Sequence, residues 1–428
     1  MLTEFSPRQL SDPVIAEADG ILRSCVHCGF CTATCPTFHL LGDELDSPRG
    51  RIVLIKEMHE NGGVPGSTVV KHLDRCLTCL SCMTTCPSGV DYMHLVEGAR
   101  NRIEDYPEAR PLRQRLVRRL LRGLLTNRRL FHLSMRLAAL ARPLAPFLPG
   151  LPRRLLTKAP RLSPPAPASA VYPAVGHCRA RVALLTGCAQ SVVGGEINRA
   201  AIRLLARHGA EVVVSDVPCC GALDSHLGAA VAARGRAATA VRRWWRETAA
   251  GGGAGLDAVV ITTSGCGTSV KDYGHLLAGD PELAEPARQI AALTVDVSEW
   301  MDRVGLLPPA HPPGGRVAYH AACSLQHGQR QRKAAPALLR AAGFETLDVA
   351  DGHFCCGSAG TYNILQPVLA DGLKSKKQDN IRVLAADMVA TGNLGCILQL
   401  QDGLELPVLH TLQLLDWATG GPKPQGVT

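Results

Sequence analysis

From residue 176 to the C-terminus, short apolar runs alternate with longer stretches in which apolar residues recur with helical spacing. Residues 181–188 (RVALLTGC) and 316–323 (RVAYHAAC) predict buried strands. Each run is followed by a helical stretch that stops at a glycine, INRAAIRLLARHG in one case and APALLRAAG in the other. We therefore expect two α/β units, each with a parallel sheet covered by helices.

These two units look like copies of one another. In both, a cysteine ends the first strand and a Cys-Cys-Gly turn follows 31 or 32 residues later. A last cysteine comes after a further apolar segment. The cysteines are Cys188, Cys219, Cys220 and Cys266 in the first unit, repeat 1, and Cys323, Cys355, Cys356 and Cys396 in the second, repeat 2. The shared order predicts strand, helix, strand, Cys-Cys-Gly turn, helix and strand in each repeat.

Residues 106–175 contain no cysteine and follow a different pattern. At 100° per residue, the leucines from Leu112 to Leu125 cover one side of a helix, and the other side carries Arg115, Arg118, Arg119 and Arg122. Three interpretations stay open: a helix lying on anionic lipid, a helix that docks its leucine face on a neighbouring domain or subunit, and a nucleic-acid arm. No base-reading motif accompanies the arginines, so nucleic acid is not expected. The proline-rich stretch 164–173 predicts a loose linker.

Composition adds a compartment and a chemistry. No apolar stretch reaches the 18 residues needed to cross a bilayer, and the N-terminus lacks a secretory signal. We therefore expect a cytoplasmic protein, with peripheral contact at the cytoplasmic face of the inner membrane as an open alternative. Disulfides are rare in that compartment, so 17 cysteines in 428 residues indicate metal binding or redox chemistry. The net charge of +9 arises in residues 110–161, which hold fourteen Lys or Arg and no acid.

Two runs in the first 105 residues share the spacing Cys-x2-Cys-x2-Cys-x3-Cys-Pro. This is the spacing of bacterial [4Fe–4S] ligation, in which the fourth cysteine of each run binds the cluster of the other run. We predict one cluster on Cys25, Cys28, Cys31 and Cys86, and a second on Cys76, Cys79, Cys82 and Cys35. Zinc fits less well, because its sites typically use two closely spaced pairs of ligands.

The sequence around these runs predicts helices. Residues 47–58 begin with Ser47 as N-cap and Pro48 in the first turn, and a second helix is expected over residues 13–23. A helical ferredoxin domain is therefore expected. Arg49 and Arg51 lie near the first run in sequence and are candidates to donate hydrogen bonds toward a cluster. A solvated helix start is the alternative interpretation of these two arginines.

Residues 25–58, the second run CLTCLSCMTTCPSGVDY, the segment SGCGTSVKDYGHLL and the two Cys-Cys-Gly repeats together resemble the glycolate oxidase (glycolate dehydrogenase) iron–sulfur subunit family. The resemblance covers nearly the whole chain and is weakest over residues 106–175. It implies an electron-transfer subunit of an oxidoreductase complex, whose FAD-containing subunits oxidise glycolate to glyoxylate and whose electrons pass toward a respiratory acceptor. Subunits of glycerol-3-phosphate dehydrogenase, lactate-utilisation and heterodisulfide reductase systems are similar and remain the alternative.

The chain itself has no flavin, nicotinamide or phosphate-loop motif, so no catalytic residue is predicted in it. The resemblance also has a departure: related reductase subunits end each repeat in CxxC and carry five cysteines, whereas each repeat here has four. Four thiolates still suffice for a further cluster or a zinc ion, so repeats with and without metal both stay open. We expect an α+β multidomain protein with a helical ferredoxin domain (1–105), an Arg/Leu/Pro-rich helical connector (106–175), repeat 1 (176–308) and repeat 2 (309–428).

Overall fold

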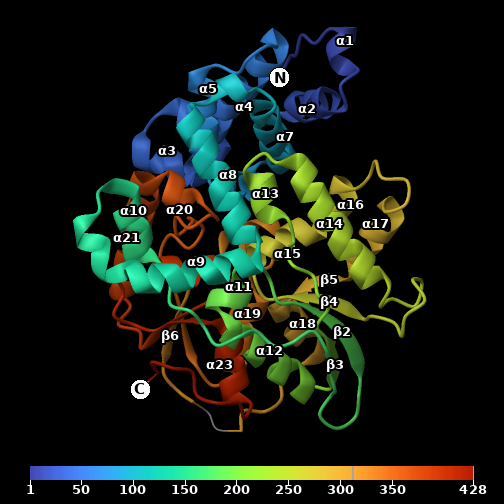
Figure 1. Cartoon of the computed structure of the whole chain (residues 1–428), viewed down its shortest axis with the longest axis vertical. Helices are drawn as coiled ribbons and strands as arrows, with labels where there is room; N and C mark the ends of the chain where they lie inside the picture. The colour runs from blue at the N-terminus through green and yellow to red at the C-terminus, as the bar shows by residue number, and fades with distance from the viewer. Residues whose placement is uncertain (311–312, 428) are drawn as a thin grey trace.

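The computed structural model describes residues 1–310 and 313–427. An N-terminal helical region lies at one end of the molecule, two sheet-containing units lie at the other, and long helices cross between them (Figure 1). This arrangement confirms the expected α+β multidomain fold class. Among the described residues, no helix combines the length and the apolar character that crossing a bilayer requires.

The N-terminal region consists of short helices around one apolar core. Ser47 accepts a hydrogen bond from the Gly50 amide and Pro48 occupies the first turn, so the helix predicted over residues 47–58 is confirmed and runs to Asn61. The helix predicted over 13–23 is also present. The elements are α1 (Pro7–Leu10), α2 (Pro13–Ser24), η1 (Phe30–Thr34), α3 (Pro36–Leu41), η2 (Glu44–Asp46), α4 (Pro48–Asn61), α5 (Ser67–Asp74), α6 (Ser81–Thr85), α7 (Tyr92–Glu104) and η3 (Pro107–Ala109).

Repeat 1 forms a five-stranded sheet in the order β1-β3-β2-β4-β5. All of its pairings are parallel except that of β1 with β3. Strand β2 is buried between two neighbours, as its continuous apolar run predicts. The elements are β1 (Val171–Tyr172), β2 (Ala180–Leu185), α11 (Gln190–Val193), α12 (Gly195–Arg207), β3 (Ala210–Val213), α13 (Ala222–His226), α14 (Ala230–Trp245), β4 (Ala258–Ile261), α15 (Ser264–Lys271), α16 (Tyr273–Leu276), α17 (Ala284–Leu293), β5 (Thr294–Asp296) and α18 (Val297–Val304).

Repeat 2 forms a four-stranded parallel sheet in the order β7-β6-β8-β9. Apart from the edge strand β1, this is the order of repeat 1, which supports duplication. One hydrophobic core includes residues of both repeats, among them Leu205 and Leu415. The elements are β6 (Arg316–Tyr319), the π-helix η5 (Ser324–Gly328), α19 (Ala334–Ala341), β7 (Glu345–Asp348), α20 (Tyr362–Leu365), α21 (Pro367–Arg382), β8 (Met388–Thr391), α22 (Leu394–Gln401), β9 (Val408–His410) and α23 (Thr411–Ala418).

The glycine of each Cys-Cys-Gly turn is required by the backbone. Gly221 and Gly357 have φ of +87° and +85°, a left-handed conformation that side chains disfavour. Each also lies against a helix: an added Cβ would come within 3.0 Å of the Ala233 carbonyl at Gly221 and 2.5 Å of the Ala370 carbonyl at Gly357. The turn therefore brings the paired cysteines close to a helix in each repeat.

Helices α8 (Leu112–Thr126), α9 (Arg128–Ala141) and α10 (Gly150–Lys158), with η4 (Arg142–Phe147), connect the two ends of the molecule. Two of the four arginines on one side of α8 contact acidic side chains of the chain itself. Arg118 is buried 3.4 Å from Asp74, and Arg122 lies 3.6 Å from the buried Asp224 of repeat 1. These carboxylates hold two of the four arginines against the protein.

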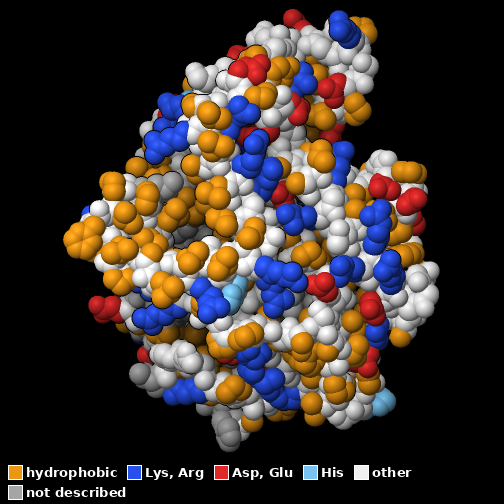
Figure 2. Space-filling view, in the orientation of Figure 1, with side chains coloured by type: hydrophobic (Ala, Val, Ile, Leu, Met, Phe, Trp, Pro, Cys, Tyr) orange, Lys and Arg blue, Asp and Glu red, His pale blue; other side chains and the backbone are white. Residues whose placement is uncertain are grey.

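On the side of α8 away from these carboxylates, Leu112, Leu116 and Leu120 are exposed, whereas Leu121 is buried. The exposed leucines continue along α9 and η4 as one apolar surface, the leucine patch, which consists of Leu112, Leu116, Leu120, Leu130, Leu133, Leu137, Leu140, Leu144 and Phe147. Figure 2 shows apolar side chains gathered over these helices, with basic side chains beside them. Contiguous exposed apolar surface is typical of regions that bind a protein partner or a membrane.

The stretch 164–173 is not the loose linker that its prolines predict. Ala166 is buried, and Val171–Tyr172 form strand β1, which pairs with β3 of repeat 1. The carbonyl oxygen of Pro164 also packs closely against Gly195. A Cβ added at Gly195 would lie 2.3 Å from that oxygen. Proline cannot continue a central strand, but it is compatible with packing along a sheet edge, which is where this segment lies.

Candidate metal centres

The first three cysteines of the first run and the last cysteine of the second surround one small cavity. Its lining includes Cys25, Cys28, Cys31 and Cys86, the first site. The turn between them depends on Gly29, which has a φ of +85° and lies against Arg49. Cys28 is exposed whereas Cys25 is buried, so one edge of the first site meets solvent.

The remaining four cysteines line a second cavity. Cys35, Cys76, Cys79 and Cys82 are all buried and form the second site; Cys82 also borders the first cavity. Cys35 reaches the second run because Pro36 starts helix α3 directly after it and turns the chain away from the first run. The sets of four brought together are those predicted to share clusters.

Arg51 and Arg49 have different surroundings. Arg51 is fully buried and its Nη1 lies 3.8 Å from Cys35 Sγ, within reach of a weak hydrogen bond to sulfur. Its other donors bind the His72 carbonyl at 2.7 Å and Asp46 at 3.2 Å, which fixes the guanidinium in place. Arg49 is half-exposed, pairs with Glu44 at 2.7 Å and borders the first cavity.

The charge around Cys76 favours its thiolate. Burial opposes ionisation, but the nearby guanidinium groups of Arg51 and Arg100 outweigh it and lower the pKa of Cys76. Burial instead raises the pKa of Cys79 and of Cys82, which have no such partner among their principal neighbours. Because the thiolate is the form that binds metal, Cys76 is the thiol of this set that is best prepared for a cationic ligand.

Sequence reasoning missed three residues that support the second site. Tyr92 donates a hydrogen bond to Cys76 Sγ at 3.7 Å, and Thr37 Oγ1 lies 3.3 Å from Cys35 Sγ. Arg100 donates to the Cys76 carbonyl at 2.6 Å. Tyr92 comes six residues after Cys86 and Arg100 fourteen residues after it, and neither belongs to the Cys-x2-Cys-x2-Cys-x3-Cys-Pro spacing. Only Thr37, two residues after Cys35, stands close enough in sequence to have been considered.

The eight cysteines of the repeats gather in two groups of four. In repeat 1, hydrogen bonds with Cys188 and Cys220 lower the pKa of Cys219; Cys266, on α15, neighbours Cys220. In repeat 2, Cys323 Sγ and Cys355 Sγ lie 3.7 Å apart. The side chain of Cys356 forms a hydrogen bond with that of Cys396. The ninth cysteine of this part of the chain, Cys178, is exposed and outside both groups.

Repeat 2 packs directly against the second site. Cys79 and Cys355 belong to one buried cluster, with Cys323 beside it. Thr84 lies 2.8 Å from the His327 ring of η5, and Tyr362 donates to the Arg75 carbonyl at 2.9 Å. The inner face of the ferredoxin-type region and the cysteines of repeat 2 are therefore neighbours, although about 240 residues separate them in sequence.

A larger cavity of about 720 Å³ adjoins the second site. It is lined by Cys76, Leu77 and Thr78, by helix α8 and by α20 of repeat 2. Basic side chains, including Lys71, Arg75 and Arg113, border it together with apolar ones. The cavity therefore lies between the second site, helix α8 and repeat 2.

Comparisons with known proteins match both parts of the chain. The family model of the 4Fe–4S dicluster domain matches residues 21–90, and that of the Cys-Cys-Gly cysteine-rich domain matches residues 182–271 and 317–401. The glycolate oxidase iron–sulfur subunit of Escherichia coli (strain K12) is 39% identical over 98% of this chain and 99% of its own. A probable glycolate oxidase iron–sulfur subunit of Bacillus subtilis (strain 168) is 30% identical over 95% of this chain and 94% of its own.

More distant relatives share part of this architecture. Lactate utilization protein A of Geobacillus thermodenitrificans is 24% identical over 55% of this chain and 98% of its own length. The two sets of four cysteines, the paired repeats and the end-to-end similarity to two subunits of one kind agree with each other. The chain therefore belongs to the family of glycolate oxidase iron–sulfur subunits.

Proposed function

We propose that the first and second sites each hold one [4Fe–4S] cluster, with the fourth ligand of each supplied by the other cysteine run. The grouping of the eight cysteines around two cavities supports this assignment. Such clusters, when bound, accept and release one electron at a time. Arg51 donates toward Cys35 and thereby favours the reduced state of the second cluster relative to the first.

Iron analysis tests the exchanged ligands. The full chain should bind about eight iron atoms. Cys35→Ser and Cys86→Ser should each lose the cluster whose other three ligands lie in the opposite run, so iron falls to about four or below. Cys178→Ser, an exposed cysteine outside both sites, is the control and should keep all eight. If each variant lost the cluster of its own run instead, as resolved by low-temperature EPR, the assignment would be wrong.

The two sites differ in exposure, which suggests a direction for electrons. Val26 and Phe30 stand exposed beside Cys28 and form an apolar rim at the first site. The second site is buried against repeat 2. Electrons therefore enter at the first site from a docked flavin subunit and continue inward to the second site, toward the acceptor and repeat 2.

The function that these features support is electron transfer in a glycolate oxidase complex. The observation that carries it is the end-to-end similarity to glycolate oxidase iron–sulfur subunits, joined to two complete four-cysteine sets. FAD-containing partner subunits oxidise glycolate to glyoxylate, and this chain carries their electrons toward a respiratory acceptor.

Reconstitution tests this function. The purified chain with its clusters should reduce no dye with glycolate, because it holds no substrate or flavin site that its sequence reveals. Adding the FAD-containing subunits should produce glycolate-dependent reduction of its clusters, followed by EPR. Phe30→Asp should slow that reduction at least tenfold, whereas Val231→Asp, at an exposed position in repeat 1, should not. Reduction by lactate in preference to glycolate would favour the related lactate system, and turnover by the chain alone would contradict the proposal.

The leucine patch supports a peripheral membrane location for the complex. Exposed arginines, among them Arg113, Arg119 and Arg136, border it and can reach anionic headgroups. The full chain should therefore bind vesicles containing anionic lipid in a flotation assay. Leu116→Gln with Leu133→Gln should reduce that binding at least tenfold, and Val231→Gln should leave it unchanged. Equal binding by the double variant would assign the patch to a protein partner instead.

A further inference from the structure

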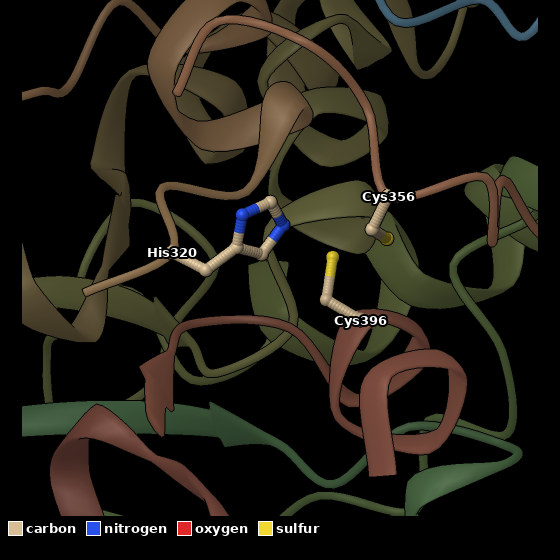
Figure 3. Close-up of side chains that lie close together, drawn as sticks. All are labelled: His320, Cys356 and Cys396. Carbon is tan, nitrogen blue, oxygen red and sulfur yellow. The ribbon is translucent and has the colours of Figure 1, made fainter. Parts of the chain in front are cut away.

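Three buried side chains of repeat 2, each of a type that can bind a metal ion, lie close together. His320 follows strand β6, Cys356 belongs to the Cys-Cys-Gly turn, and Cys396 lies on helix α22. Their donor atoms all lie within 4.8 Å of one another, and Figure 3 shows the three side chains close together, with the Cys396 sulfur beside the His320 ring. All three residues are buried, with exposed fractions of 1 or 2%. None of them belongs to the first or second site.

His320 is a polar side chain without a partner. Neither of its ring nitrogens forms a hydrogen bond with any residue that the structure describes. A buried polar group left without a hydrogen bond destabilises the fold, so native proteins rarely keep one without a reason. A ligand that accepts a ring nitrogen lone pair would remove this destabilisation.

Repeat 1 shows that the fold itself does not need a histidine here. Aligning residues 181–188 with 316–323 puts Leu185 of repeat 1 at the position of His320. Leu185 is likewise buried, in an apolar core, at the end of the equivalent strand. The cysteines corresponding to Cys356 and Cys396 are present in repeat 1 as Cys220 and Cys266. Only repeat 2 therefore combines the two thiols with an imidazole.

We propose that His320, Cys356 and Cys396 bind a single thiophilic divalent cation of the zinc type. In a tetrahedral site with Zn–S bonds of about 2.3 Å, the donor atoms lie about 3.8 Å apart, and the donor atoms of this trio all lie within 4.8 Å of one another. In a cubane each thiolate binds a different iron atom, so its ligands are held farther apart. The eight ferredoxin-type cysteines form no comparably tight trio in the described part of the chain.

The surroundings of the trio are consistent with a bound cation held by thiolates. Asn393 Nδ2 lies 3.4 Å from Cys396 Sγ and donates to it, which stabilises a thiolate. The buried Lys377 donates to the Asp351 carbonyl and lies near the turn that carries Cys356. Three protein ligands leave one position of a tetrahedron open, as in zinc sites that exchange a water or small ligand. On binding, the two thiols release their protons to solvent.

Metal analysis of the purified full chain with its clusters tests this site. We expect about one zinc per chain in addition to cluster iron, and Co²⁺ supplied in place of Zn²⁺ should give the visible absorption of a tetrahedral cobalt–thiolate site. His320→Leu introduces the residue that repeat 1 carries, so the fold should be kept. It should weaken zinc binding at least tenfold in a competition with a chromophoric chelator. Cys396→Ser should do the same.

Two controls make the result specific. His353→Gln changes another histidine of repeat 2, outside the trio, and should leave zinc binding unchanged. Leu185→His in repeat 1 should create a second Co²⁺ site with Cys220 and Cys266. Wild-type chain that binds no stoichiometric zinc, equal binding by His320→Leu and His353→Gln, or four additional irons in place of zinc would each overturn the proposal. Because cluster iron in the first and second sites is counted separately, failure here is distinguishable from failure of the proposed electron-transfer function.

Discussion

The two Cys-Cys-Gly repeats share their strand order and their glycine turns but meet the N-terminal region through different chemistry. Repeat 1 does so through contacts between histidines and carboxylates: His94 of α7 lies 2.9 Å from Asp272, and Glu17 lies 2.6 Å from His275. Repeat 2 uses buried apolar packing around Cys79 and neutral hydrogen bonds from Thr84 and Tyr362. A duplicated scaffold has thus acquired two unlike contacts, and only the repeat 2 contact brings its cysteines against the second site.

The Cys-Cys-Gly motif and the residues around it therefore differ independently between the two repeats. The Cys-Cys-Gly glycines are fixed by backbone geometry that both copies need. Backbone geometry does not restrict the residues at the contact in this way. It also does not restrict the position that holds Leu185 in repeat 1 and His320 in repeat 2. These residues can therefore differ between the repeats without disturbing the fold.

The largest expected effect is on the pH dependence of the repeat 1 contact. Burial opposes protonation, but Asp272 and Asp91 outweigh it and raise the pKa of His94 to about 10. A raised pKa in the folded state means that this contact is fully stabilising below about pH 6.5 and is lost as the pH rises toward 10. The loss should amount to about 1.4 kcal/mol per pH unit in that window, at most about 4 kcal/mol between pH 7 and 10.

Amide hydrogen exchange, corrected for its intrinsic pH dependence, can follow this contact. Protection of α7 and α16 should fall between pH 7 and 10, whereas protection around η5 should not. There, burial lowers the pKa of His327 to about 4, so its ring is neutral throughout. His94→Gln should abolish the difference between the two repeats. Parallel loss of protection in both would contradict this account.

A smaller difference is expected between the two glycine turns. Gly357→Ala should destabilise the protein by about 3 kcal/mol, because left-handed strain adds to a close approach to the Ala370 carbonyl. In Gly221→Ala the added methyl group lies farther from the facing carbonyl oxygen, so the substitution should lower the free energy of unfolding by about 1.5 kcal/mol. Urea unfolding measures both values. Gly235→Ala, a helical position with open space around it, is the control and should be neutral or stabilising. If both substitutions lowered the free energy of unfolding equally, left-handed strain alone would account for the loss, and the contact with the helix carbonyl would not contribute.

The smallest effect concerns the repeat 2 contact. Thr84→Val removes the hydrogen bond at 2.8 Å to the His327 ring and should cost about 1 kcal/mol. The measurement is a local increase in hydrogen exchange around η5, with α16 of repeat 1 unaffected. Thr85→Val, which alters a neighbouring hydroxyl bonded to Thr34 within the N-terminal region, is the matched control. No change around η5 would mean that apolar packing alone holds repeat 2 in place.

Much of the fold was predictable because its signals are local. Ser47 and Pro48 mark the start of α4 with their own side chains, and the apolar run at residues 181–188 specifies a buried strand. The surface of α8 was less predictable. Its period was clear in the sequence, but the partners of Arg118 and Arg122 are Asp74 and Asp224, which lie far away in the chain.

Spacing along the chain was enough to indicate two four-cysteine sets and two repeated α/β units. Such features repeat at fixed short intervals, because a tight turn or a strand end must hold them. The contact between Cys79 and repeat 2, the support of Cys76 by Tyr92 and Arg100, and the convergence of His320 with Cys356 and Cys396 emerged only in three dimensions. Each joins side chains from separate elements, and the distance between such side chains depends on how helices and sheets pack rather than on their order in the sequence.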